Sequence, residues 1–599
     1  TLFKVMNDKS SFMALCSKLD YSILYINEIK RLEALFVDPI SLSILEKAKF
    51  PTNFKGLLIK ASEMLLDDYY NNPNNIKDMC IKGYERIAGM IYHQLIDAIR
   101  DYDNKSAFSK AQINVKPYSI ISLINEDSTT VLVDDLNPIA AMKQTEDVSY
   151  LGSLGYNKEA LARSSRIYNE SEVGVISEAV KDSGDVGITA YMTAAPKIKD
   201  IRGGIDEFDA KKDGPVSTYS TSALLCPFSL SDDTKRLNFA SIMKSHIIPI
   251  NGMSVPYVRT GYEAIVPIRS NDKFVITAED NGVVTKVSKT DVEVKYNKTT
   301  KKYKIKDWTT KEESGACYTH VMKSNVEVGD KVSKDDTIIY DQAFFQPDIF
   351  NPKRVIYREG TTINVALVEN PETYEDSAAI SQHMSEKLGT TVTKVKSIII
   401  EAANNIYDVK KVGDRLEPND TLLSSVAGGF LDKTLDARTL EILKNLKTSS
   451  PKAKVRGVIT KIQVKYNCNL EDMSDTIREF TMTIDRQTKA DTGFTGKIEN
   501  GSYSINGNVL QPGYIEIKFY IQVGVKQGIG DKAIFANQLK FTVGEVFDHN
   551  ITTEDGTTVD ALFSYRSISA RIVNSPLLMG AAGMVLSKLE DKAIDLYFK

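Results

Sequence analysis

The residues of this 599-residue chain with the clearest chemical potential lie in short, charged motifs in turns. Glu375 and Asp376 form an acidic pair that follows a β-branched run. Such a pair can hold Mg²⁺, directly or through water, because this hard cation takes oxygen ligands. Basic side chains in loops at strand ends can hold phosphates, and the candidates are Arg236, Lys532, Lys540 and Arg571. Each residue alone is more simply explained as a solvated charge.

Other classes of catalytic site are poorly supported by the sequence. The five histidines show no H-E-x-x-H pattern, and no G-x-S-x-G is present, so a zinc enzyme and a Ser-His-Asp hydrolase are both disfavoured. A Walker A loop and a G-x-G-x-x-G after a strand are also absent. The five cysteines contain no C-x-x-C pair, which argues against a disulfide scaffold and favours a reducing compartment.

Composition indicates an ordinary globular protein. Hydrophobic residues make up 42% and charged residues 26% of the chain, whose length corresponds to about four domains. The net charge of -4 excludes a globally basic DNA-coating protein but allows a locally basic channel in a large assembly. No run of about 18 apolar residues occurs, so we expect no membrane span, and the first residues do not resemble a signal peptide.

The hydrophobic pattern predicts a mixed α and β architecture. Apolar residues at helical spacing predict helices over 77–102, after a loop at 71–75, and over 576–599. Short β-branched runs dominate from about residue 236 and predict strands. The clearest of these strands are 282–287 and 292–296, joined by a hairpin turn at 297–302, together with 362–368 and 514–525.

One internal repeat is visible. Val-Gly-Asp-Lys-Val at 328–332 leads into Asp-Thr-Ile-Ile at 336–339, and Val-Gly-Asp-Arg-Leu at 412–416 leads into Asp-Thr-Leu-Leu at 420–423. Gly-Asp supplies a turn, a short strand follows, and the second aspartate turns the chain again. We interpret this as a generic β-barrel hairpin used twice rather than as a duplicated function.

From about residue 80 onward, these motifs resemble, in order, the β subunit of multisubunit DNA-dependent RNA polymerases. Residues 374–377 resemble that family's N-F-E-D-S, and 530–532 with Lys540 resemble G-D-K-M-A-G-R-H-G-N-K with both lysines in register. Residues 232–236 resemble D-D-A-N-R, and 559–571 align without a gap with V-D-I-V-L-N-P-L-G-V-P-S-R. Weaker matches lie at 83–86, 113–117, 135–139, 151–152 and 258–263.

The resemblance implies a role for each charged residue. Glu375 and Asp376 would help to hold the second, nucleotide-borne Mg²⁺. Arg236 and Arg571 would grip the β- and γ-phosphates, for which a planar guanidinium is well suited.

The lysines and one histidine would face the RNA. Lys532 and Lys540 would lie beside the RNA 3′ end and the reactive phosphate, where they would stabilise developing negative charge. His246 falls where the family has a glutamine facing the RNA, although a structural histidine is an equal alternative. The three aspartates that hold the catalytic Mg²⁺ in this family belong to the β′ partner, so we expect this chain to be inactive alone.

The expected fold is mixed α+β, with a double-psi β-barrel interrupted by β-rich insertions. Strands near 255–266, 363–368 and 515–525 would form the barrel. The expected domains are a helical part (1–112), a fork or rifampicin-like region (113–230), a double-psi and hybrid-binding core (231–270, 346–400 and 513–575), a β-rich hybrid-barrel insertion (271–345), a wall or flap (401–512) and a C-terminal helix (576–599).

Divergence from the family narrows the resemblance. The glycines and the histidine normally found between the two lysines are replaced at 533–539. Within these 599 residues we expect most of the family's N-terminal lobes and its C-terminal clamp signature to be missing. Such a chain resembles the C-terminal β-like piece of the split RNA polymerases of giant (jumbo) bacteriophages. Its partners would be a β-like N-terminal chain, β′-like chains, a promoter-specificity factor, template DNA, the RNA–DNA hybrid and NTPs, in the cytoplasm of an infected bacterium or in the virion.

Two alternatives remain open from the sequence. One is a catalytically inactive structural or nucleic-acid-binding subunit with the same fold. The other is a gene-silencing RNA-dependent polymerase, which would carry its aspartate triad in the same chain.

A first prediction concerns rifampicin. Gln144 and Asp147 fall where the family has a histidine and an arginine that bind the drug. We therefore expect transcription by the assembled enzyme to continue at rifampicin concentrations that stop a bacterial polymerase assayed in parallel. Inhibition at ordinary drug concentrations would show that this part of the alignment is wrong.

Overall fold

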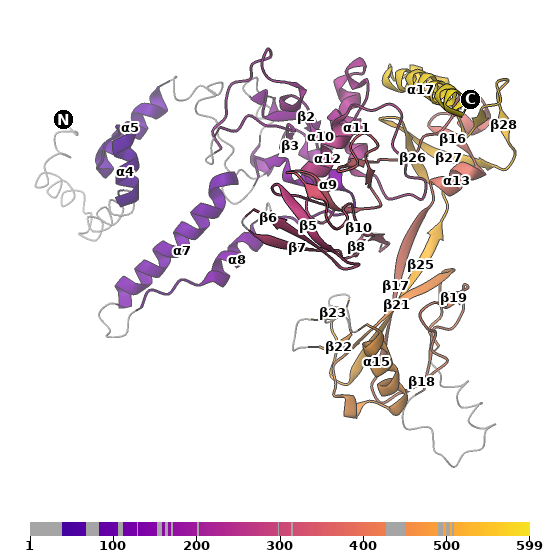
Figure 1. The fold of residues 1–599 in the computed structure, drawn as a ribbon. Coiled ribbons are helices and arrows are strands. Elements are labelled where there is room, and N and C mark those ends of the chain that lie inside the picture. The colour runs from indigo at the N-terminus through magenta and orange to yellow at the C-terminus, as the bar shows by residue number, and fades with distance from the viewer. Residues whose placement is uncertain are drawn as a thin grey trace, which may run out of the picture. The chain divides into compact units, whose positions relative to one another are not determined.

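The protein is represented by a computed structural model in which two compact units are described separately (Figure 1). The described residues are 37, 39–67, 83–105, 112–127, 130–151, 158–161, 166–168, 172–181, 183–199, 203–297, 299–312, 315–426, 450–488, 495–498, 503–505 and 508–598. Unit 1 comprises Thr1–Glu126, Ile167–Val175 and Lys197–Lys212, and unit 2 comprises Asp127–Arg166, Ile176–Pro196 and Asp213–Lys599.

Unit 1 is mainly helical where it is described. Its helices are α4 (Pro39–Lys47), α5 (Phe54–Leu66), α7 (Gly83–Lys105) and α8 (Pro117–Glu126). The Asn53 side chain caps α5 by accepting a hydrogen bond from the Gly56 N–H at 2.6 Å. The predicted helical region is therefore confirmed for these residues. The predicted loop at 71–75, the helix start at 77–82 and Gly152 lie outside the described residues.

The first part of unit 2 surrounds helix α11 (Thr234–Ser245). Helices α9 (Pro138–Thr145) and α10 (Thr221–Leu224) and strand β2 pack against it. Strand β2 belongs to a three-stranded sheet of order β1–β3–β2, formed by Asp147–Ser149, Thr189–Met192 and Ile176–Val180. Two side chains from α9 or its cap reach α11: Asn137 donates to the carbonyl oxygens of Ser245 and Ile247 at 2.8 and 2.9 Å, and Lys143 donates to the Ser241 hydroxyl at 3.3 Å.

A five-stranded mixed sheet forms the C-terminal core of unit 2. Its order is β15–β30–β16–β27–β26, with β15 parallel to β30 and β16 parallel to β27. Phe535, Phe541 and Phe563 pack together beneath it, and the first two rings stack with centroids 4.1 Å apart. The strands are β15 (Val365–Leu367), β16 (Ser377–Ser381), β26 (Lys532–Phe535), β27 (Leu539–Phe547) and β30 (Ala561–Phe563).

A second large sheet is built on two long antiparallel strands. Strands β17 (Thr390–Glu401) and β25 (Tyr514–Val525) pair along twelve residues, and β25 also pairs with β21 (Gly457–Tyr466). One face buries an isoleucine-rich core against helix α15 (Asp475–Gln487). Four further strands complete this sheet: β8 (Trp308–Lys311), β9 (Cys317–His320), β19 (Arg415–Leu416) and β22 (Gly496–Lys497).

Smaller sheets fill the predicted β-rich insertion. A four-stranded sheet has the order β11–β5–β6–β7, formed by Lys331–Val332, Gly282–Val287, Asp291–Tyr296 and Thr300–Lys304. A three-stranded sheet has the order β10–β12–β4, formed by Met322–Ser324, Thr337–Asp341 and Val275–Thr277. The two-stranded sheets are β13 (Phe345–Pro347) with β14 (Val355–Tyr357), β18 (Asn405–Tyr407) with β20 (Ser424–Val426), β23 (Ser504–Ile505) with β24 (Asn508–Val509), and β28 (Ile551–Thr552) with β29 (Thr558–Val559).

The Gly-Asp repeat forms the same turn twice. Gly329 and Gly413 have φ angles of 97° and 96°, in the left-handed region that favours glycine. The carboxylates of Asp330 and Asp414 each accept a hydrogen bond from the backbone N–H three residues earlier, at 2.7 and 2.8 Å. The second aspartate of each copy makes the same contact. The predicted arrangement of turn, short strand and turn is therefore confirmed.

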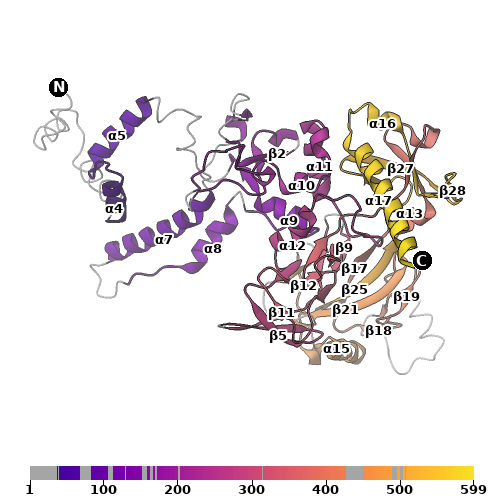
Figure 2. The ribbon, with the colours of Figure 1, turned by 45° about the horizontal axis from the view of Figure 1, so that its top comes forward.

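The predicted C-terminal helix is confirmed as α17 (Ser575–Phe598), the longest helix of the described part. It lies beside the five-stranded sheet in both views (Figures 1 and 2). Lys588 pairs with Asp555 at 2.7 Å, and the Tyr257 hydroxyl donates to Glu590 at 2.5 Å. Neither α17 nor any other described helix combines the length and the apolar character needed to span a bilayer.

Three strand predictions need correction. Residues 255–266 contain a 3-10 turn at Tyr262–Ala264 and the start of α12 (Val266–Arg269), because Pro256 and Pro267 interrupt the β-branched run. The strand predicted at 515–525 exists as β25 but pairs with β17 and β21 instead of joining the five-stranded sheet. The turn expected at 297–302 is shorter, since β7 already begins at Thr300, and the strand expected at 362–368 contains only Val365–Leu367. The predicted domain limits stay predictions.

Candidate active site

The acidic pair lies at the start of the central strand β16. A 3-10 turn, η9 (Pro371–Thr373), precedes it, and the Asn370 side chain caps this turn by accepting from the Thr373 N–H at 2.9 Å. Glu375 has a φ of 54°, a left-handed conformation that is uncommon for a residue other than glycine. This sharp reversal places both Glu375 and Asp376 in exposed positions just before the strand.

Two loops far apart in the sequence are joined at this point. The Glu369 carboxylate accepts hydrogen bonds from the Ser564 hydroxyl and from the Arg566 N–H, each at 3.0 Å. In the first turn of α16 (Tyr565–Ser569), the Ser567 hydroxyl donates to the backbone carbonyl of Glu375. Loop 369–376 is therefore bonded at both of its ends to the segment that carries Arg571.

Arg571 forms an ion pair with Asp376. One guanidinium nitrogen, Nη2, contacts both carboxylate oxygens, with the Oδ2 distance at 2.5 Å, while Nη1 donates to the Ser567 carbonyl at 3.2 Å. The side chains retain 27% and 50% of their accessible surface, so the pair lies at the surface and can exchange partners with a solute. The structure thus brings together two predicted site residues that are separated by almost two hundred positions.

Both lysines project from the same region of the five-stranded sheet. Lys532 is paired with Thr542, which in turn is paired with Ser377 on β16, and the Thr542 N–H donates to the Asp376 carbonyl at 2.8 Å. At about 4.8 Å between neighbouring strands, the Cα atoms of Lys532 and Ser377 are about 10 Å apart. Lys540 lies two residues before Thr542 on β27, so both exposed lysines point to the same face.

Arg236 and His246 occupy opposite ends of α11. Arg236 is half-buried on the first turn, with its guanidinium 5.7 Å from the centre of the Phe239 ring. The segment before it contacts the turn that precedes Lys540, because Asn537 donates to the Pro227 carbonyl at 3.0 Å. His246 follows the last helical residue and lies about 15 Å along the axis from Arg236. The connection to the lysine-bearing hairpin therefore involves the Arg236 end of the helix.

The acidic pair suits a shared metal ion better than a complete metal site. The described residues contain no group of three or more histidine, cysteine, aspartate or glutamate side chains able to hold a metal. Glu375 and Asp376 could supply one or two oxygen ligands to a Mg²⁺ that brings phosphate and water oxygens of its own. The described residues therefore allow an ion that is shared with another molecule and do not form a complete metal site.

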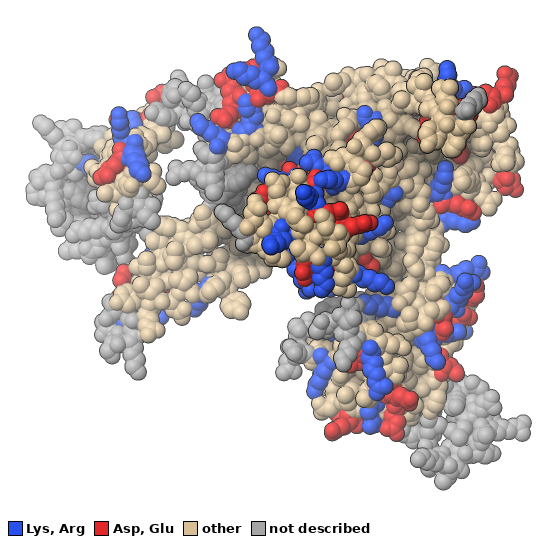
Figure 3. All heavy atoms as spheres, in the orientation of Figure 1, with Lys and Arg blue, Asp and Glu red and all other residues tan. Residues whose placement is uncertain are grey.

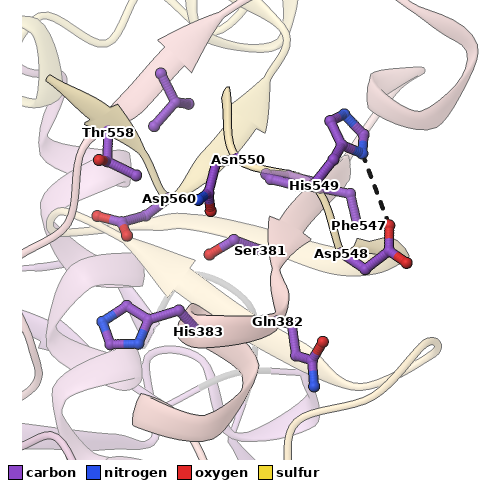
Figure 4. A pocket seen from close by; sticks show the side chains of 10 residues that line it. Ser381, Gln382, His383, Phe547, Asp548, His549, Asn550, Thr558 and Asp560 are labelled. Carbon is purple, nitrogen blue, oxygen red and sulfur yellow. Dashed lines mark ion pairs between the residues drawn. The ribbon is translucent and has the colours of Figure 1, made fainter. Parts of the chain in front are cut away.

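A pocket of about 360 Å³ lies at the other ends of β16 and β27 (Figure 4). His383, Asp548, His549 and Asp560 are among the residues that line it, and His549 Nδ1 is 3.9 Å from Asp548 Oδ1. Because β16 and β27 are parallel, this pocket and the lysine face occupy opposite ends of the same strand pair. It is separate from the candidate active site.

The lysine-rich stretch at 298–306 does not form a purely positive surface where it is described. Lys302 on β7 pairs with Asp291 at 3.3 Å, and Lys301 pairs with Glu279. Figure 3 accordingly shows basic and acidic side chains mixed in this part of the visible face. The β6–β7 hairpin is therefore a weaker candidate for phosphate binding than the face of the five-stranded sheet that carries Lys532 and Lys540.

Several residues that organise the site were not singled out from the sequence. Asp232 belongs to the motif at 232–236, but the sequence predicted no role for it. Glu369, Ser567 and Asn537 belong to no pattern that predicts a function. Their contacts join positions that lie roughly 190 to 340 residues apart, a relation that no local pattern reveals.

Comparison with known proteins agrees with the resemblance seen in the motifs. Residues 2–159 match the family model described as bacteriophage RNA polymerase. The chain is 21% identical over 567 residues to the DNA-directed RNA polymerase subunit beta of Malacoplasma penetrans, covering 82% of this chain and 40% of that protein. It is 22% identical over 469 residues to the same subunit of Mycoplasmopsis synoviae, covering 75% and 35%. This chain thus spans less than half the length of these relatives and is similar to RNA polymerase β subunits along most of its own length.

The contacts of Glu369 predict a pH dependence. Hydrogen bonds from the Arg566 backbone and the Ser564 hydroxyl lower the pKa of Glu369 below its ordinary value of 4.5. The ionised carboxylate therefore adds stability above about pH 4.5, and this contribution is lost as the pH falls through the lowered pKa. We expect the melting temperature of the wild type to exceed that of Glu369→Gln near pH 7, with the difference shrinking below pH 4 in scanning calorimetry.

A matched control comes from Glu554, an exposed carboxylate in another loop. We expect Glu554→Gln to leave the melting temperature unchanged across the same pH range. A Glu369→Gln difference that is the same at pH 7 and at pH 3.5 would contradict the stated role of Glu369.

Proposed function

We propose that this chain is a β-like subunit of a multisubunit DNA-directed RNA polymerase, contributing phosphate and RNA contacts to an active site that a β′-like chain completes. The observation that carries the proposal is the convergence of Asp376, Arg571, Lys532 and Lys540 at one end of the five-stranded sheet. These are the positions that the resemblance matches to the functional residues of the family. The similarity to β subunits supports the same assignment.

In this proposal the cations bind the nucleotide triphosphate. Arg571 and Arg236 hold the β- and γ-phosphates, for which their planar donor groups are well suited. Lys532 and Lys540 lie beside the RNA 3′ end and the α-phosphate. The RNA 3′ hydroxyl would lose its proton to water, its oxygen would bond to the α-phosphorus and the bond to pyrophosphate would break. The lysines would offset the negative charge that develops at the reacting phosphate.

The acidic pair acts on the metal that accompanies the nucleotide. Mg²⁺ bound to the triphosphate screens its charge and favours departure of pyrophosphate. Glu375 and Asp376 orient the nucleotide by offering oxygens to that ion. Asp376 is paired with Arg571 in the free chain, so binding exchanges this contact for two new ones: the arginine moves to phosphate and the carboxylate to the ion.

The proposed roles of these residues also predict what the other chains of the complex contribute. The ligands of the catalytic Mg²⁺ would come from the β′-like chain, which makes the isolated subunit inactive. The five-stranded sheet would form part of a double-psi β-barrel, and α11 would present His246 to the RNA–DNA hybrid. A β-like N-terminal chain, a promoter-specificity factor and template DNA complete the expected partners.

A narrower proposal is that the chain comes from a giant-phage enzyme with a split β subunit. The match of residues 2–159 to the bacteriophage RNA polymerase family model supports a phage source. The expected location is then the cytoplasm of the infected bacterium or the virion.

The function is tested on the complex purified through a tag on this chain. We expect it to contain β′-like chains and to extend RNA on a DNA template. Lys540→Ala and Asp376→Ala should each lower the elongation rate about 10²-fold. Lys540→Ala removes a cation that offsets negative charge in the transition state, and Asp376→Ala removes a group that orients the nucleotide through its ion. Rates are measured on preformed elongation complexes, so that assembly does not limit them.

Lys323→Ala in β10 provides a matched control, since this lysine is also exposed on a strand but lies in another sheet. We expect its elongation rate to equal that of the wild type. Undiminished elongation by Lys540→Ala and Asp376→Ala would refute the site assignment. A complex that binds nucleic acid without extending RNA would favour the inactive structural subunit.

A further inference from the structure

Asp232 joins three segments that are distant in the sequence. Its Oδ1 accepts hydrogen bonds from the backbone N–H groups of Asn574 and Ser575 at 2.8 and 2.9 Å. Its Oδ2 accepts from the Ser575 hydroxyl at 2.5 Å and lies 3.5 Å from Nε2 of Gln538. One carboxylate thus holds the start of α17, the β26–β27 turn and the segment that leads into α11.

A second contact closes this arrangement. Asn537 donates both to the Pro227 carbonyl at 3.0 Å and to the Ser575 hydroxyl at 3.2 Å. Asn537 and Ser575 retain 3% and 0% of their accessible surface, so these bonds are shielded from water. Hydrogen bonds shielded from water are costly to break, because the separated groups would stay unpaired, so they leave the joined segments little freedom.

Each joined segment carries one of the candidate cations. Arg236 lies four residues after Asp232, Lys540 lies two residues after Gln538, and Arg571 lies three residues before Asn574. The three cations come from regions more than 300 residues apart at the extremes, and like charges repel when they are brought together. The Asp232 carboxylate contacts groups of the other two segments, so it holds all three together against this repulsion.

We infer that Asp232 is a positioning residue that holds Arg236, Lys540 and Arg571 in register for the triphosphate. This inference rests on the proposed function and adds a residue that does not itself touch the nucleotide. Loss of the carboxylate charge leaves each cation present but misplaced. The affinity of the assembled site for NTP then falls, even when the complex stays intact.

The test uses the assembled complex with Asp232→Asn, which keeps the shape of the side chain and removes its charge. We expect the KM for NTP to rise about tenfold or more in single-nucleotide addition, because the phosphate contacts of the ground state are lost. A purely structural defect would lower the active fraction, and therefore the apparent kcat, without changing KM. Active complexes are counted by the fraction of RNA extended at saturating NTP.

Two further variants separate the effect of the Asp232 contacts from the effect of how α17 packs. Ser575→Ala removes the hydroxyl that Asp232 and Asn537 share, and we expect a smaller rise in KM in the same direction. Asp555→Asn removes the Lys588 pair, which anchors α17 away from the cation-bearing segments, and should leave the KM unchanged.

The outcomes distinguish this inference from the function on which it rests. A wild-type complex that does not extend RNA refutes the proposed function, and the role of Asp232 with it. An active wild type together with an unchanged KM in Asp232→Asn refutes only the positioning role. An equal rise in KM in Asp555→Asn also refutes it, because the effect would then reflect loosening of α17.

Discussion

The whole arrangement depends on the pairing of β16 with β27 and β30. Parallel strands cannot be joined by a tight turn and require a long connection between them. Here that connection runs from Ser381 to Leu539 and contains five of the seven strands of the second large sheet, namely β17, β19, β21, β22 and β25. The insertion can therefore be large without disturbing the pairing, and the loops before β16 and β27 stay side by side, with Thr542 bonded to Asp376.

Helix α11 is the second fixed element, and polar contacts hold it near both ends. Lys244 forms a buried ion pair with Glu359 near the end that carries His246, and Asp232 lies just before the start. Buried pairs of this kind contribute little net stability, because desolvation offsets most of the attraction, but breaking one leaves an unpaired buried charge. Such contacts favour a single position of the helix. If Arg236 binds a phosphate as proposed, this fixed position matters more than additional stability.

The sequence predicted helices, turns and single strands, which depend on neighbouring residues. It did not predict strand partners or side-chain contacts between distant residues. Helical spacing predicted α17, and the Gly-Asp repeat predicted two turns whose aspartates bond to backbone three residues away. The β-branched run at 514–525 predicted a strand but not its partners, since register with β17 and β21 is set by a core assembled from distant residues. The motifs supplied the predicted site residues for the same reason: each is short, whereas Asp232 and Ser567 act through partners that no spacing reveals.

In the proposed function, the charges at the candidate site would suit this chain to one half of the reaction. The side chains proposed to face the nucleotide are four cations and two carboxylates, whereas Glu369 and Asp232 are bonded to backbone and hydroxyl groups. Such an excess of positive charge would attract a triphosphate and disfavour a bare divalent ion. The Asp376–Arg571 pair lessens the repulsion among the cations while no nucleotide is bound. In the proposed function, a metal would reach this face more readily on a nucleotide than alone. The ligands of the ion that activates the RNA 3′ hydroxyl would then come from a second chain.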